Sequence, residues 1–289
     1  MQKPQKHALL VALVAALAFA GVARAQNQST APAIISVLNA ASFVSADKGI
    51  SPGEIISIFG TNLGPTDALG LQLDAMGNVA SLVGGVQVLF VDPYNPYPSG
   101  TIAAPLTYVS ATQINCVAPY EIQPEPPYYI EVNYLGQASS DVFAFYPTTT
   151  GLNANNTGIF TATGTGTGQA AALNSDNSPN TTSDPASAGS IVQVWMTGEG
   201  QTSPAGVTGS VTCSSGCATT SQIPKPLLPV TATVGGQPAT VSFYGEAPGL
   251  VAGVMQVNLF IPPNTPSGAV SLSVTVGSST QAGITIAVK

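Results

Sequence analysis

Two stretches of this chain decide its fold, and each is a copy of the other. Residues 51–64 read SPGEIISIFGTNLG, and residues 187–200, 136 positions later, read SAGSIVQVWMTGEG. In both stretches, apolar side chains alternate along a run that begins and ends at a Gly-containing turn. Alternation with a period of two is typical of a β-strand with one buried face. Each stretch therefore predicts one strand of a repeated β-unit.

Other landmarks occur in the same order in both halves. The matched pairs are Leu38-Asn39 with Leu173-Asn174, Gly84-Gly85 with Gly235-Gly236, Gln113-Ile114-Asn115 with Gln256-Val257-Asn258, and Pro119 with Pro262. Trp195 matches Phe59, and we expect it in the core. Short alternating runs separated by Gly and Pro clusters indicate a sandwich. The sequence predicts an all-β protein with two tandem immunoglobulin-like β-sandwich domains, residues 34–150 and 151–289, after a short linker at 26–33.

The first 25 residues have the pattern of an export signal. Lys3 and Lys6 precede an apolar run at residues 8–20, and Ala23-Arg24-Ala25 fits a small-residue cleavage site. We therefore expect cleavage after Ala25 and a protein that is secreted, periplasmic or attached to the cell surface. No later stretch predicts a transmembrane segment.

Composition excludes several classes of chemistry for the remaining chain. After residue 25 the only cationic side chains are Lys48, Lys225 and Lys289, against 13 Asp and Glu, and neither His nor Arg remains. A Ser-His-Asp or Cys-His catalytic site and a His-ligated zinc site are thereby excluded within this segment. An acidic surface with so few cations is also a poor partner for nucleic acid. We therefore expect no enzymatic activity.

Several motifs carry a resemblance to a known family. They are LNAASF (38–43), GQAAALN (168–174), TGEGQT (197–202) and APGLVAG (247–253), and the repeated unit itself is similar to IPT/TIG-type immunoglobulin-like domains. Together they resemble the Solibacter-type C-terminal domain family of acidobacterial exported proteins. The resemblance implies an extracytoplasmic β-sandwich and brings no established catalytic function with it.

Tyrosines mark a candidate binding surface. Eight of the nine lie before residue 151, and the first domain has an insertion between Gly85 and Pro105 that the second lacks. This proline-stiffened insertion carries Asp92, Tyr94, Asn95 and Tyr97. Tyrosine combines a flat apolar face with a polar tip, which suits recognition of sugars or proteins. The alternative is that these rings only cover the edge of the sandwich.

Glu199 lies inside the strongest shared motif, TGEGQ. Two carboxylates can hydrolyse a glycosidic bond without histidine, and Glu246 and Asp184 are possible partners. The other interpretation is a turn residue whose carboxylate accepts backbone N–H groups. We favour the turn and assign no catalytic residue.

The three cysteines suggest structural roles. Cys213 and Cys217 are separated by three residues, which in an oxidising compartment favours a disulfide over a soft-metal pair. Cys116 lies between apolar residues of a predicted strand, which favours a buried, inert thiol.

No metal or cofactor site is expected, with calcium left open. Residues 174–177, NSDN, and Asp184 offer the hard oxygen ligands that Ca²⁺ prefers, without a recognised calcium loop. The sequence thus predicts an exported, non-catalytic interaction or structural module that binds protein or glycan through its loops. The alternative is a carboxylate-based glycoside hydrolase or an accessory domain of one.

Overall fold

The computed structural model describes residues 31–95, 100–122, 127–139, 143–145, 157–213, 216–217 and 219–289. These residues form β-strands, loops and two short 3₁₀ helices, η1 (Ala46–Lys48) and η2 (Thr220–Gln222). The predicted all-β fold class is confirmed. Within these ranges no helix has both the length and the apolar character that crossing a membrane requires.

The N-terminal unit, residues 33–145, consists of two sheets. One has the strand order β1-β2-β7-β6-β3, and the other has the order β10-β8-β4-β5 with β9 paired to β8. The strands are β1 (Ala33–Asn39), β2 (Ile55–Thr61), β3 (Leu69–Gly70), β4 (Val86–Val91), β5 (Thr101–Ala103), β6 (Leu106–Val109), β7 (Gln113–Val117), β8 (Tyr128–Tyr134), β9 (Gln137–Ala138) and β10 (Phe143–Phe145).

The C-terminal unit, residues 158–288, follows a continuous path of strands, β11-β14-β19-β18-β17-β20-β22-β12, with β13 and β21 at its sides and a separate β15-β16 pair. The strands are β11 (Gly158–Ile159), β12 (Gly168–Gln169), β13 (Ala172–Asn174), β14 (Ile191–Thr197), β15 (Thr202–Ser203), β16 (Lys225–Pro226), β17 (Val230–Val234), β18 (Gln237–Glu246), β19 (Met255–Phe260), β20 (Gly268–Val276), β21 (Ser279–Thr280) and β22 (Ile284–Val288).

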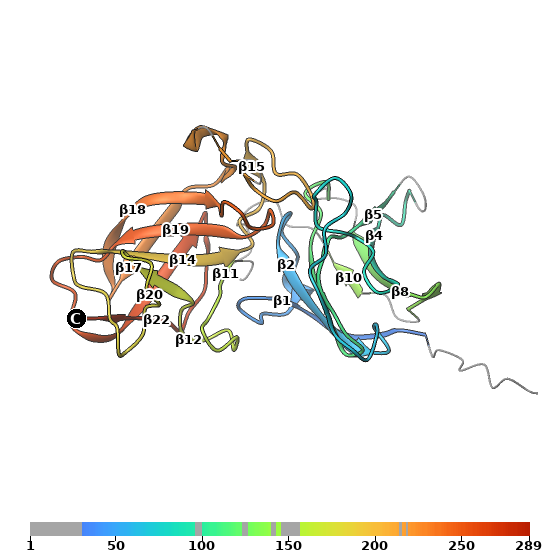
Figure 1. The fold of residues 1–289 in the computed structure, drawn as a ribbon, viewed down its shortest axis with the longest axis horizontal. Helices are drawn as coiled ribbons and strands as arrows, with labels where there is room; N and C mark the ends of the chain where they lie inside the picture. The colour runs from blue at the N-terminus through green and yellow to red at the C-terminus, as the bar shows by residue number, and fades with distance from the viewer. Residues whose placement is uncertain are drawn as a thin grey trace, which may run out of the picture.

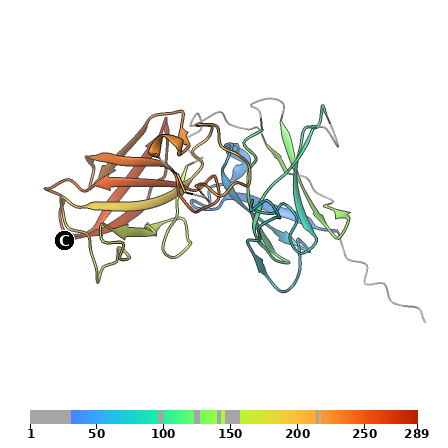
Figure 2. The ribbon, with the colours of Figure 1, turned by 45° about the horizontal axis from the view of Figure 1, so that its top comes forward.

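Each unit has its own hydrophobic core, and the two units lie side by side (Figures 1 and 2). The cores form because alternate side chains of each strand point to the same face of the sheet. Along β4, for example, the side chains of Val86, Val88 and Phe90 are buried, and the side chains between them are partly exposed. The N-terminal core includes Ile58, Phe90, Ile114 and Ile130, and the C-terminal core includes Val194, Val257, Val274 and Ile286.

Strand register supports the repeat inferred from the sequence. Ser57 of β2 lies opposite Asn115 of β7, and the aligned residues Gln193 and Asn258 lie opposite each other in β14 and β19. Asn39 likewise pairs with Ile56, as Asn174 pairs with Val192. Because a shift of one residue would reverse the side chains of a strand, this agreement places the same positions on the same faces in both units.

One landmark of the sequence alignment is wrong. Gly84-Gly85 precedes β4, whereas Gly235-Gly236 forms the tight turn between β17 and β18. β4 and β17 are equivalent by their partners, since β4 pairs with β8 and β5 as β17 pairs with β20 and β18. The Gly235-Gly236 turn therefore corresponds to the longer loop of residues 92–100. Two adjacent glycines occur at both places because both need positive φ angles.

Candidate functional site

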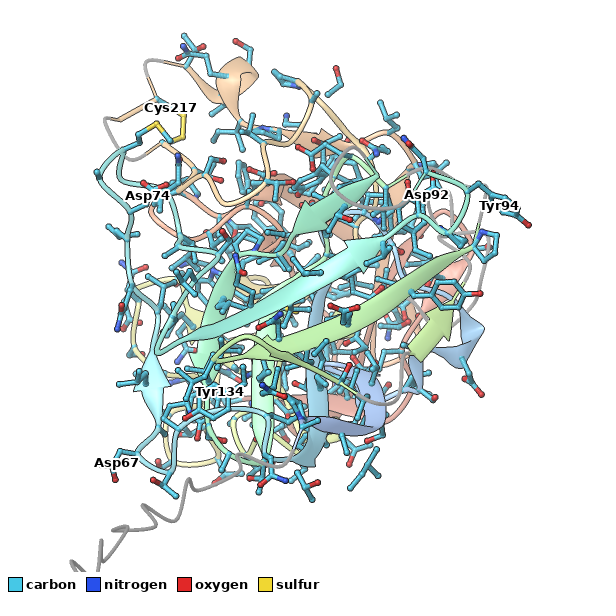
Figure 3. The ribbon with its side chains drawn as sticks, turned by 90° about the vertical axis from the view of Figure 1, so that its right-hand side faces the viewer. Asp67, Asp74, Asp92, Tyr94, Tyr134 and Cys217 are labelled. Carbon is cyan, nitrogen blue, oxygen red and sulfur yellow. A yellow bond between two sulfur atoms is a disulfide. The ribbon has the colours of Figure 1, made fainter. Side chains whose placement is uncertain are left out.

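The predicted recognition loop joins β4 to β5 and is held at its base. The backbone N–H of Asp92 donates to the carbonyl of Gly100 at 2.9 Å, and the Asp92 carboxylate accepts the N–H of Tyr94 at 2.9 Å. The N–H of Asn95 donates to the carbonyl of Asp92 at 3.2 Å. Tyr94 is 80% exposed, so its ring does not cover the sandwich edge. Figure 3 shows it projecting from one edge of the N-terminal unit. Tyr97 lies outside the described residues.

A second site, not predicted as such, lies where the two units meet. We call it the junction and define it by Gly53 and Tyr120 of the N-terminal unit and Glu199, Gly206 and Glu246 of the C-terminal unit. The Tyr120 ring follows β7 and is 5% exposed. A Cβ atom on either glycine would lie 2.5 Å from the Cζ atom of this ring. The ring therefore occupies a slot that only glycine leaves open on both sides.

Hydrogen bonds fix this segment across the junction. The Tyr120 N–H donates to the Thr208 hydroxyl at 2.9 Å, and the Gln201 amide donates to the Tyr120 carbonyl at 2.7 Å. The Ile55 N–H donates to the Thr197 hydroxyl at 2.8 Å. These bonds satisfy backbone groups that the contact between the units removes from water.

An apolar cluster completes the contact. Its buried members come from both units: Ile55, Val79, Val117, Ala247, Val251 and Val254. Trp195 packs against this cluster and is only partly buried, so its predicted place in the sandwich core is wrong. It points away from the core because its neighbours Val194 and Met196 point inward. Trp195 also lines an apolar cavity of about 310 Å³ together with Leu173.

Two carboxyl groups converge on the Tyr120 hydroxyl. The hydroxyl oxygen lies 2.9 Å from Oε1 of Glu246 and 3.4 Å from Oε1 of Glu199. The Thr212 hydroxyl donates to Oε2 of Glu246 at 2.6 Å. Oε2 of Glu199 is buried without a hydrogen-bond partner. Glu199 and Glu246 are 0% and 1% exposed, so both groups are withdrawn from solvent.

Burial determines the protonation of this cluster. It raises the pKa of Glu199 well above its usual range, and the charge of Glu246 raises it further. Burial also raises the pKa of Glu246, but hydrogen bonds from Thr212 and Tyr120 counteract the rise. The pKa of Tyr120 is raised by burial and by the two carboxyl groups. Of the two carboxyl groups, Glu199 therefore holds its proton more firmly, and Glu246 is the more readily ionised.

The Tyr120 hydroxyl cannot donate to both carboxyl groups at once. A phenol has a single hydrogen, so it donates to only one carboxyl group, and the shorter distance selects Glu246. Oε1 of Glu199 is the more distant acceptor, at 3.4 Å from the same hydroxyl. The chain runs from Glu199 through Tyr120 to Glu246, which also accepts from Thr212. Glu246, with two hydroxyl donors, is therefore the better placed of the two carboxyl groups to carry a negative charge.

Glu54 is a separate buried carboxyl group on the N-terminal side. Its oxygens accept the Asn39 amide at 2.9 Å and the Ser51 N–H at 2.8 Å. Burial raises its pKa to about 8, and the two hydrogen bonds oppose this rise. It ties the end of β1 to the turn before β2.

The structure brings together only one of the two possible acidic pairs. Glu199 and Glu246 share the Tyr120 hydroxyl, whereas Asp184 borders a polar cavity of about 110 Å³ with Asp176 and Lys289. A glycosidase needs its two carboxyl groups on either side of a sugar. Here the space next to both groups is occupied by a buried tyrosine.

Of the predicted calcium ligands, Asn174, Ser175, Asp176 and Asp184 line that polar cavity, and Asn177 instead accepts a hydrogen bond from Gln193. The Ser178 hydroxyl bonds Oδ1 of Asp176 at 2.8 Å and Oδ2 of Asp184 at 2.6 Å. The Asn174 amide donates to the same hydroxyl at 3.1 Å. Hydrogen bonds to Ser178 lower the pKa of Asp176. In the part of the chain that the structure describes, no three acidic, His or Cys side chains gather as metal ligands.

The cysteines behave as predicted. Cys213 and Cys217 form a disulfide with Cα atoms 5.1 Å apart. Cys116 is a free, buried thiol, and burial raises its pKa. The disulfide loop begins directly after Thr212, so it restrains the residue that donates to Glu246.

Sequence reasoning missed Tyr120 and Thr212. The sequence around Tyr120, Pro119-Tyr120, corresponds to Pro262-Pro263 in the other copy, so the repeat offered no matching aromatic residue. A tyrosine in one copy alone does not indicate that it enters the other unit. The sequence did contain one signal of the junction: Glu199 of the second copy aligns with the apolar residue Leu63 of the first.

No family model matches the chain, and the comparison with curated proteins also finds no match. The family resemblance therefore stays a prediction.

Proposed function

We propose that the protein is an exported, non-catalytic interaction module. Two tandem immunoglobulin-like units, held together at the junction, present the loop between β4 and β5 to a protein or glycan partner. The observation that carries this proposal is the exposure of Tyr94, 80%, on a loop whose base is hydrogen-bonded. An exposed tyrosine ring offers a large contact area at a low cost in conformational entropy on binding.

The position of the loop supports this role. It connects two strands of the sheet on the side of the N-terminal unit that lies away from the C-terminal unit (Figure 1). A partner can reach Tyr94 there without meeting the second unit. The buried junction supports a fixed orientation of the two units, because Tyr120 is enclosed by residues of both.

Export is supported by two features of the chain. Residues 1–25 have the pattern of a signal peptide. The disulfide between Cys213 and Cys217 is typical of an oxidising compartment.

A binding experiment with a matched control tests the proposal. The purified protein and its Tyr94→Ala variant are applied to a glycan array and used in pull-downs from the native cell envelope. Met76→Ala is the control because Met76 is 82% exposed, and Asp74, two residues away, lies at the opposite edge (Figure 3). We expect binding to be lost at least tenfold with Tyr94→Ala and unchanged with Met76→Ala. Equal binding by all three proteins would overturn the role of the loop.

A second candidate function follows from one observation, the shared contact of Glu199 and Glu246 with Tyr120. If the junction opens, these carboxyl groups could serve a glycoside hydrolase. Hydrolysis of a polysaccharide panel that disappears in both Glu199→Gln and Glu246→Gln would favour this function. Activity that neither variant changes would assign it to another site or to a contaminant.

A further inference from the structure

We propose that the junction is a proton-dependent contact. It is closed while Glu199 carries a proton, and it opens in alkali when that proton is lost and two adjacent carboxylates face one phenol. The inference concerns how the two units are held together and is independent of what the exposed loop binds.

Among the residues that the structure describes, the side-chain hydrogen bonds of the two carboxyl groups come from the hydroxyls of Tyr120 and Thr212. Both carboxyl groups are within hydrogen-bond distance of the Tyr120 hydroxyl, and only one of them can accept its hydrogen. Oε2 of Glu199 is buried and lacks a donor. An ionised Glu199 would therefore be a buried carboxylate with one unsatisfied oxygen beside a second carboxylate.

The charged groups on the surrounding elements do not offset this charge. Glu121, next to Tyr120, accepts the Thr208 hydroxyl and is itself acidic. Glu54, next to Gly53, bonds within the N-terminal unit. Lys225 of β16 is the nearby cation, and its ammonium lies 5.4 Å from the centre of the Tyr244 ring. Burial and the charge of Glu246 raise the pKa of Glu199, and the hydrogen bond from Tyr120 only partly opposes this rise.

The sign of the pH effect follows from these contacts. Because the pKa of Glu199 is higher in the closed state than in water, the closed state binds the proton more tightly than the open state. Closure is favoured at low pH and is weakened as the pH rises toward the pKa of the closed state. Water can reach Glu199 only if the contacts of Tyr120 with Gln201 and Thr208 are also broken. Loss of one proton therefore releases the whole contact.

Trp195 provides a natural probe. It is the only tryptophan in the chain, and it packs against the apolar cluster between the units. We would follow its emission wavelength together with the radius of gyration from small-angle X-ray scattering, from about pH 6 to about pH 9.5, below the usual range of exposed tyrosines. We expect a reversible red shift and a larger radius as the pH rises, with circular dichroism showing intact β-strands.

Two substitutions identify the responsible group. Glu199→Gln imitates the protonated carboxyl group and should abolish the alkaline transition. Glu54→Gln is the matched control, since it removes another buried glutamate but should leave the transition in place. If Glu199→Gln does not fold, Glu246→Gln removes one of the two charges and must reduce the opening.

Three results would overturn the proposal. The first is a wild-type protein without the transition, and the second is a transition that Glu54→Gln removes and Glu199→Gln retains. The third is a transition that shifts on addition of Ca²⁺ or EDTA, because a cation would then be the neutralising group.

Discussion

The two units use the same strand end for different purposes. Leu63 and Glu199 are aligned in the repeat, after β2 and β14, and both are 0% exposed. Leu63 is part of the N-terminal hydrophobic core, whereas Glu199 lies at the junction and bonds Tyr120. Full burial therefore has a different cause at each position: Leu63 packs within its own unit, and Glu199 contacts the other unit.

A second pair of aligned positions differs in the opposite direction. Glu54 is buried in the N-terminal unit, and its counterpart Ser190 is partly exposed. Each unit thus carries a buried glutamate that the other lacks, on either side of the contact. The sandwich tolerates an acid at these positions only where neighbouring groups have been adapted to it.

Exchanging the residues at positions 63 and 199 should break this comparison most strongly. Leu63→Glu places a carboxyl group in an apolar core and should lower the free energy of unfolding by about 3–5 kcal/mol. Glu199→Leu removes a buried acid and should cost less than about 2 kcal/mol, since replacing a buried charged group with an apolar one is often neutral. Urea denaturation at pH 7 measures both. Similar losses would show that the two positions are equivalent.

The stability of the protein should depend on pH through Glu54 and not through its aligned counterpart Ser190. The pKa of Glu54 is raised from 4.5 to about 8, so the folded state holds one more proton than the unfolded state between these values. Stability should therefore fall as the pH rises through this window, by at most about 1.4 kcal/mol for each pH unit from this group. Glu54→Gln should make the curve flatter, and Ser190→Ala should not. An unchanged slope in Glu54→Gln would contradict the assignment.

Gly206→Ala tests the slot around the Tyr120 ring. The new Cβ would lie 2.5 Å from the ring, so the ring has to shift. We expect a loss of about 1–3 kcal/mol in the free energy of unfolding and faster amide exchange on both sides of the junction. Gly70→Ala is the control, because a Cβ there meets nothing within 4 Å. Equal losses of stability in the two variants would show that the Tyr120 ring does not require glycine at position 206.

The disulfide loop has no counterpart in the N-terminal unit, and its effect should be the smallest. Replacing Cys213 and Cys217 with Ser should lower the free energy of unfolding by at most about 2 kcal/mol, because the closed loop is short. Since the loop restrains Thr212, hydrogen exchange should rise around Glu246 more than in the C-terminal core. A uniform change over the unit would argue against this link.

Much of the fold could be predicted because it depends on local patterns. Alternation and the repeat indicated β-strands, and the register of β2 with β7 and of β14 with β19 agrees with the aligned sequences. The alignment of Gly84-Gly85 with Gly235-Gly236 was wrong because two adjacent glycines fit any turn that needs positive φ angles. The Cys213–Cys217 disulfide followed from the short spacing of the two cysteines together with the expected oxidising compartment.

The junction could be predicted only in part. Glu199 and Glu246 were recognised as a possible pair, but their separation depends on how the strand ends of β14 and β18 come together. Their shared contact with Tyr120 joins residues 79 and 126 positions apart in different units. No local pattern encodes such a contact. The exposure of Tyr94 was one of two alternatives that its place in an insertion left open.

A double-mutant cycle tests most directly whether Glu199 is part of a contact between units. The free energy of unfolding is measured at pH 7 for the wild type, Tyr120→Phe, Glu199→Gln and the double variant. Because both residues belong to one hydrogen-bonded chain, we predict a coupling energy of at least about 0.5 kcal/mol. Additive effects, with no coupling, would contradict the account and return Glu199 to the role of a simple turn residue.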